Sequence, residues 1–182
     1  MFSPLRYFRR KGYGVQSPFA YHVVRDIVAE TTPFYAYAEL RQHFGRRRDE
    51  PLLQLLLRLA NDVQPDTVYI YTERDASSSD TAPLAAYLKA GCRRASIEVW
   101  QTESTPPPPR SARLVVAPDA RAALALIDNI ADDGCLVVFD TRAARAAYRE
   151  LQTHPRATAL FDLRTHALLF PRHSQPKAVY KV

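Results

Sequence analysis

DTVYIYTERDASSSDTAPLAAYL, residues Asp66–Leu88, is the stretch that decides the fold. Its apolar run of β-branched and aromatic residues at 67–72 predicts a strand. A polar turn follows, and the alanine-rich segment at about 80–90 predicts a helix. In doubly wound α/β folds the ligand sits beyond the carboxyl ends of the parallel strands, next to a turn of this kind. The position is therefore that of a ligand loop, although its turn contains no glycine.

The chain on both sides extends this pattern. Helices are expected at about residues 17–29, 37–44 and 50–63, the first opened by a capping Ser17 and by Pro18. Strands at about 95–100, 113–117, 134–139, 156–162 and 166–170 follow, with helices at about 119–131 and 141–153 between the later ones. We predict one domain over residues 1–182, with an N-terminal helical segment at 1–65. Residues 66–182 would form a Rossmann-like α/β core with about six mostly parallel strands.

Two connections shape the expected sheet. Gln101–Ser111 contains four consecutive prolines, which cannot form an α-helix, so we expect an extended polyproline spacer. Parallel neighbours are normally joined by a crossover with a helix, and an element is therefore missing at this point. The last two strands are separated by about Arg164-Thr165 and should form an antiparallel hairpin at one edge. The tail Lys177–Val182 either adds a further edge pairing or lies over the sheet.

Composition narrows the class of protein. The 182 residues are 47% hydrophobic and 24% charged, as in an ordinary globular domain. A net charge of +6 is compatible with an acidic partner such as RNA and equally with general solubility. Cys92 and Cys135 lack metal or redox spacing and are expected to be buried, reduced thiols. The histidines indicate no metal site. Without a signal peptide or a membrane-length apolar run, we expect a cytoplasmic protein.

Two segments carry a family resemblance. KGYGVQSPFAYHVVRDIV and CLVVFDTRAARAAYRELQTHPRATALFDLRTHALLFPR resemble a Bacteroidetes family of class I S-adenosylmethionine-dependent methyltransferase-like proteins. The matching motifs are Ser17-Pro18-Phe19, Phe139-Asp140 and His154-Pro155. The resemblance implies a Rossmann-like sheet that ends in a hairpin of Ala157–Asp162 and His166–Phe170. It also implies deletion of one βα unit before Arg113–Pro118, and the sequence leaves open whether the sheet is then continuous.

The same resemblance implies S-adenosylmethionine as the ancestral cofactor. Glu98 resembles the carboxylate that accepts hydrogen bonds from the cofactor ribose, or it is simply a polar residue on a strand face. The family's acidic residue and glycines correspond to Ile70, Thr72 and Ala76, so we expect cofactor binding to be lost. The ancestral cleft would be lined by Glu98, Tyr71, Thr72, Ser77 and Asp140.

For two parts of this cleft, the turn at residues 77–80 and Asp140, helix capping is an alternative to ligand binding. Residues 77–80 offer hydroxyls and a helix N-terminus that attracts anions, or else Ser79 or Asp80 caps the helix, with Pro83 in its first turn. Asp140 lies at a carboxyl strand end, where ligands bind, but Asp140 or Thr141 could equally cap the next helix.

Three functions follow from these observations. The first is a noncatalytic, methyltransferase-derived domain that acts as an interaction or regulatory module, with an unknown protein partner or as a homo-oligomer. The second is an S-adenosylmethionine-dependent methyltransferase with an altered pocket, whose acceptor and catalytic residues are unknown. The third is RNA binding, because basic and aromatic residues are mixed in the N-terminal arm, residues 1–14, and Arg46–Arg48 adds positive charge. The alternative for this arm is that it packs on its own domain.

Overall fold

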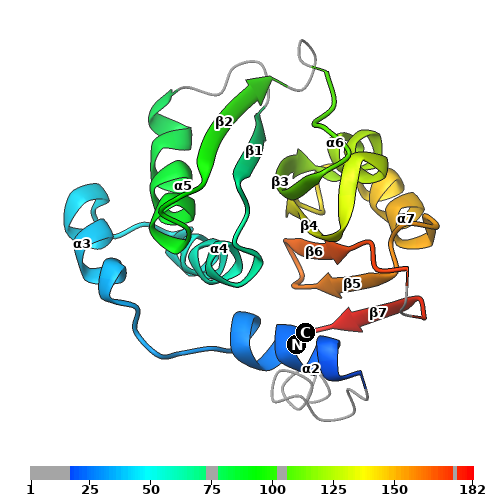
Figure 1. The fold of residues 1–182 in the computed structure, drawn as a ribbon, viewed down its shortest axis with the longest axis horizontal. Coiled ribbons are helices and arrows are strands. Elements are labelled where there is room, and N and C mark those ends of the chain that lie inside the picture. Colours follow the sequence, from blue (N-terminus) through cyan, green and yellow to red (C-terminus); the bar gives the residue numbers. More distant parts are fainter. Residues whose placement is uncertain (1–16, 73–77, 102–105, 174–175) are drawn as a thin grey trace. The chain divides into compact units, whose positions relative to one another are not determined.

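The structure, a computed structural model, describes residues 17–72, 78–101, 106–173 and 176–182 (Figure 1). The chain divides into two compact units. The first holds the helices up to Gln64 together with the helix that leads to Ala95. The second holds the strands and the last two helices. Each unit is described by itself below.

The helical unit begins where the sequence predicts. Ser17 caps the first helix, because its hydroxyl oxygen accepts a hydrogen bond from the Ala20 amide, and Pro18 is the first helical residue. The helix expected at 17–29, however, is α-helical only as far as His22. Its hydrogen bonds widen to a π-helical period, and the Ala29 amide bonds to the Val24 carbonyl five residues back. The helical elements of this unit are α2 (Pro18–His22), η1 (Val23–Val28), α3 (Tyr35–Phe44), α4 (Glu50–Val63) and α5 (Ser78–Gly91).

Helix α5 packs on α4 at a position that only glycine fits. A Cβ atom built on Gly91 would lie 2.2 Å from the backbone oxygen of Leu57 and 3.0 Å from the Cβ of Ala60. The predicted N-terminus of α5 is wrong: the helix already starts at Ser78, so neither Ser79 nor Asp80 stands at the N-cap position. Pro83 falls beyond its first turn.

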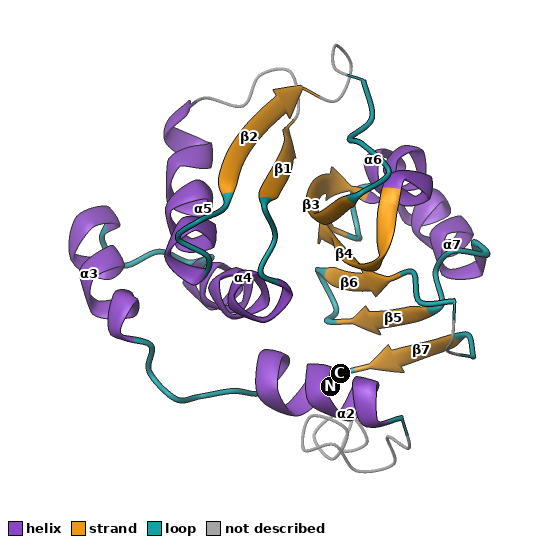
Figure 2. Cartoon of the chain, in the orientation of Figure 1, coloured by secondary structure: helices purple, strands orange, loops and turns teal. Residues whose placement is uncertain are grey.

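The second unit contains one mixed sheet in the order β2-β1-β3-β4-β6-β5-β7, and Figure 2 shows its strands in orange. All neighbours pair in parallel except β6, which is antiparallel to both β4 and β5. This is a Rossmann-like α/β fold with a C-terminal hairpin, as predicted. The strands are β1 (Thr67–Thr72), β2 (Ser96–Gln101), β3 (Ala112–Asp119), β4 (Ile130–Asp140), β5 (Ala159–Asp162), β6 (Ala167–Phe170) and β7 (Ala178–Lys181).

The sheet answers two questions that the sequence left open. It is continuous, because β3 pairs directly with β1, with Val68 opposite Leu114. The tail forms an edge strand, since β7 pairs in parallel with β5 and Leu160 lies opposite Val179. The sheet therefore has seven strands, where about six were expected.

Several element boundaries differ from the prediction. The expected helix at 119–131 ends as α6 (Ala120–Leu126) plus one 3₁₀ turn, η2 (Ile127–Asn129), because β4 already begins at Ile130. The expected helix at 141–153 is α7 (Arg145–Thr153), and the expected strand at 156–162 starts only at Ala159. Helices α6 and α7 pack on one face of the sheet around a buried apolar cluster that includes Leu126, Leu136 and Leu151.

Candidate functional site

The strand order changes direction at β1, which lies between β2 on one side and β3 on the other. In open α/β sheets, ligands bind at such a switch point, outside the carboxyl ends of the strands. Those ends are Thr72 in β1, Gln101 in β2 and Asp119 in β3. The fold therefore places the candidate site around the end of β1. Ser77, one of the predicted site residues, lies outside the described residues.

Aromatic side chains dominate the face of β1 that belongs to the α6 and α7 cluster. Trp100 of β2 packs edge-on against Tyr69 and Tyr71, with ring centroids 5.0 and 5.7 Å apart. Parallel pairing explains the group, because Tyr71 lies opposite Trp100 and side chains in register point to the same face. Aromatic pairs in this geometry stabilise by about 0.5 to 1.5 kcal/mol beyond their buried area.

The proline-rich connection is tied to this face. Because β2 and β3 flank β1, the chain between them has to pass over β1. The hydroxyl of Tyr71 donates a hydrogen bond of 2.9 Å to the Pro106 carbonyl, and the Asn129 amide donates one of 3.0 Å to the Pro108 carbonyl. Pro108 is buried. Prolines 106–109 contain no helix, as the sequence predicts, and the segment is held from two different elements.

The local environment keeps both tyrosines protonated. Burial is the main cause that raises the pKa of Tyr71, and the neighbouring Tyr69 and Glu98 raise it further. Burial and then the charge of Glu98 also raise the pKa of Tyr69, partly offset by a hydrogen bond with Thr67. The Tyr71 hydroxyl is therefore a donor at neutral pH, as its bond to the Pro106 carbonyl requires.

The predicted site residues fall into two separate groups. Glu98 lies within β2, opposite Tyr69 and three residues before the strand ends at Gln101; it is half-buried. The Thr72 hydroxyl donates a hydrogen bond of 3.3 Å to the Trp100 carbonyl. Tyr71, Thr72 and Glu98 are thus brought together on neighbouring strands.

Asp140 belongs to the other group, at the end of β4. Two strand spacings, about 10 Å, separate β4 from β1. Its carboxylate accepts hydrogen bonds from the amides of Arg142 and Ala143, at 2.7 and 3.2 Å. It therefore closes the turn before α7. Thr141 does not cap α7 either: it is buried, and its hydroxyl donates to the Arg164 carbonyl.

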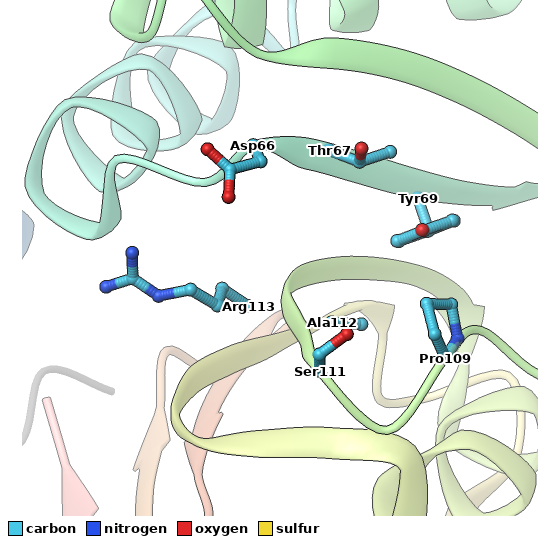
Figure 3. Close-up of a pocket in the computed structure, with 7 residues that line it drawn as sticks. All are labelled: Asp66, Thr67, Tyr69, Pro109, Ser111, Ala112 and Arg113. Carbon is cyan, nitrogen blue, oxygen red and sulfur yellow. The ribbon is translucent and has the colours of Figure 1, made fainter.

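A pocket of about 140 Å³ lies near the amino ends of β1 and β3, whereas the candidate site lies at the carboxyl ends of the strands (Figure 3). Asp66, Thr67 and Tyr69 at the amino end of β1 line one side. The other side is formed by residues around the start of β3: Pro109, Ser111, Ala112 and Arg113. Its lining includes both the Asp66 carboxylate and the Arg113 guanidinium. The sequence did not single out this pocket, because its two sides come from segments forty or more residues apart.

Two residues of the candidate site, Trp100 and Asn129, were missed by sequence reasoning. Trp100 follows Glu98 by two residues, so the two side chains share one face of the strand, and this spacing was the only available signal for its orientation. No sequence signal indicated Asn129, because its role depends on the path of the proline segment, whose Pro108 carbonyl it binds. Within the described residues, no group of three His, Cys, Asp or Glu side chains could hold a metal ion. No helix in the described part of the chain is long and apolar enough to cross a bilayer.

Comparison with known proteins returned no match, whether to a family model, a curated protein or a solved structure. The function is therefore argued from the geometry of the site.

Proposed function

We propose that this protein is a noncatalytic α/β domain, derived from the S-adenosylmethionine-dependent methyltransferases that its sequence resembles, which acts as an interaction or regulatory module. The observation that carries this proposal is the hydrogen bond from Tyr71 to the Pro106 carbonyl. It ties the chain's own proline-rich segment to the second-to-last residue of β1, next to the switch point where a cofactor would be expected to lie.

The energetic argument compares this segment with an entering ligand. A ligand that stacked on Tyr71 would displace the prolines and break the bonds made by Tyr71 and Asn129, each of which contributes about 1 kcal/mol. It would also expose the buried Pro108. Because these contacts are intramolecular, they form without the loss of translational freedom that a free ligand incurs on binding.

The carboxylates at the strand ends also serve the fold. Asp119 accepts hydrogen bonds from the amides of Arg121 and Ala122 and so caps α6. Asp140 accepts two backbone amides in the same manner. The Asp119 cap contributes about 1 kcal/mol, and each Asp140 hydrogen bond contributes about as much. Methyl transfer depends chiefly on aligning donor and acceptor in a closed pocket, so carboxylates that are committed to backbone amides favour a noncatalytic role.

The competing function is an S-adenosylmethionine-dependent methyltransferase that uses Glu98 to hold the cofactor ribose. Isothermal titration calorimetry with S-adenosylmethionine and with S-adenosylhomocysteine separates the two functions. We expect no binding heat for either compound. Micromolar binding that Glu98→Ala weakens at least tenfold would overturn the noncatalytic proposal. Glu39→Ala, which removes an exposed carboxylate from α3, is the matched control and should leave any binding unchanged.

A further inference from the structure

Strand β2 forms one edge of the sheet, and in the described chain it pairs only with β1. The Ser96 amide bonds to the Asp66 carbonyl, so the backbone groups of Ser96 point toward β1. Backbone groups alternate in direction along a strand. Those of Trp100 also point toward β1, since its carbonyl accepts a hydrogen bond from the Thr72 hydroxyl. The amides and carbonyls of Ile97, Val99 and Gln101 therefore point away from the sheet.

The outward edge of β2 lacks the features that usually prevent strand pairing. Natural edge strands carry lysines, prolines or bulges that discourage another strand from adding. The opposite edge has such protection, because β7 ends in Lys181 and follows Pro176 and Lys177. In β2 the one charged residue is Glu98, whose side chain lies on the face of Tyr69. Val99 is 48% exposed.

The sequence of β2 is complementary to itself in one antiparallel register. A two-fold axis at Val99 places Val99 opposite Val99 of a second copy and Ile97 opposite Gln101. All three outward residues then form hydrogen-bonded pairs, so no outward amide or carbonyl of the strand is left over. On the other face Glu98 lies opposite Trp100 of the second copy.

Other antiparallel registers of the two β2 strands are less favourable, because they leave backbone groups unpaired or place like charges together. A two-fold axis at Glu98 would place two carboxylates directly opposite each other, which is destabilising. It would also leave Gln101 without a strand partner. An axis at Ile97 leaves Gln101 without a strand partner as well, and an axis at Trp100 leaves Ile97 without one, because β2 ends at Gln101. Charge and hydrogen-bond matching therefore select the axis at Val99.

We propose that two copies of this chain associate through their β2 strands, paired antiparallel about a two-fold axis at Val99, so that the sheets of the two copies become continuous. This inference names the partner of the proposed interaction module and in that sense rests on the proposed function. The two fail separately, however. Cofactor binding by a β2-linked dimer would overturn the noncatalytic role alone, and a monomer that binds no cofactor would overturn the interface alone.

The test measures mass in solution by sedimentation velocity and light scattering over a concentration series. We expect a dimer, and V99P should halve the apparent mass, because proline removes an outward amide that makes no bond to β1. V179P is the matched control. The Ala178 amide bonds to the Thr158 carbonyl and the Val182 amide to the Asp162 carbonyl, so Val179, 38% exposed, also points its amide outward, at the other edge. This variant should remain a dimer.

A cysteine variant covers the case in which V99P does not fold. Residues opposite each other in a hydrogen-bonded antiparallel pair have Cα atoms about 5.5 Å apart, within the range of a disulfide. V99C should therefore form a disulfide-linked dimer on mild oxidation and V179C should not, while Cys92 and Cys135 are buried. A monomeric native protein, or a dimer in which V99C does not cross-link, would overturn the proposal. Pairing of β2 with a different protein in place of a second copy would appear as such a monomer.

Discussion

The phenol hydroxyl of Tyr71 donates a hydrogen bond to the carbonyl oxygen of Pro106, with 2.9 Å between the two oxygen atoms. This contact joins a strand of the sheet to a segment thirty-five residues later in the chain. It is central to the proposed function, because it fixes the proline-rich connection beside the switch point.

Tyr71→Phe should lower the free energy of unfolding by about 1 kcal/mol, the usual contribution of one such hydrogen bond. The change keeps the ring contact with Trp100, the chain's single tryptophan, so its fluorescence reports on the site during urea unfolding. Tyr180→Phe is the control, since that ring stacks on Phe161 and phenylalanine preserves the stacking. Equal stability of Tyr71→Phe and the native protein would show that the bond to Pro106 contributes nothing.

The pKa of His22 should lie above its ordinary value of 6.5. Its Nδ1 lies 2.8 Å from an Asp26 carboxylate oxygen and its Nε2 lies 2.7 Å from one of Asp62, so both nitrogens must donate. Partial burial lowers the pKa of His22, but the hydrogen bonds to Asp62 and Asp26 outweigh it and raise the pKa above 6.5. This stabilisation is complete below pH 6.5 and is lost as the pH rises through the raised value.

The contribution of the His22 interactions to the free energy of unfolding is small, because the side chains of His22 and Asp62 are 43% and 36% exposed. We expect less than about 1 kcal/mol. An NMR titration of the histidine ring protons measures the pKa directly, and Asp62→Asn should lower it. Asp128→Asn, at an exposed position in the other unit, should leave it unchanged. A His22 pKa at or below 6.5 in the native protein would contradict the prediction.

Gly91→Ala should destabilise the helical unit by about 3 kcal/mol, at the upper end of the cost of overpacking. The new Cβ would lie 2.2 Å from a backbone oxygen of Leu57, which cannot move without distorting α4. Gly45→Ala is the comparison: its φ is +73° and its ψ is 177°, but nothing lies within 4 Å, so only backbone strain of about 2 kcal/mol is expected. Urea unfolding gives both values, and a smaller loss at Gly91 than at Gly45 would refute the packing argument.

Arg58→Met should also destabilise the helical unit, by about 3 kcal/mol, because hydrogen bonds from a charged donor are the stronger ones. The Arg58 side chain is buried, and its guanidinium donates to the Ile27 carbonyl at 2.7 Å and to the Tyr37 hydroxyl at 3.0 Å. Hydrogen exchange at residues 23–28 should accelerate. Tyr37→Phe removes only the second contact and should cost about 1 kcal/mol. Unchanged exchange in Arg58→Met would mean that η1 does not depend on this side chain.

The strong apolar runs were read correctly because their signal is local. Thr67–Thr72 and residues 134–139 are strands, and Glu50–Val63 is a helix, as their periodicity predicts. The change from α- to π-helix at Val23 was not predictable, because a six-residue segment is too short for its apolar spacing to distinguish the two helical periods. The delayed start of α7 also depends on a distant contact, because the Thr141 amide bonds to the Thr165 carbonyl.

The candidate site, too, was predictable from the sequence only in part. That a strand, turn and helix stand at a ligand-loop position follows from residues 66–88 alone, and so does the scarcity of glycine there. The grouping of Tyr71, Trp100 and Pro106 does not, since it requires the register of β1 on β2 and the path of the prolines.

The sequence by itself determined a Rossmann-like alternation of strands and helices, a closing hairpin and a proline-rich connection without a helix, because these depend on the chemistry of near neighbours in the chain. The strand order, the continuity of the sheet, the pairing of the tail with β5 and the free edge of β2 are visible only in the folded chain. Those features depend on which distant backbone groups hydrogen-bond to one another, and side-chain periodicity carries no record of that choice.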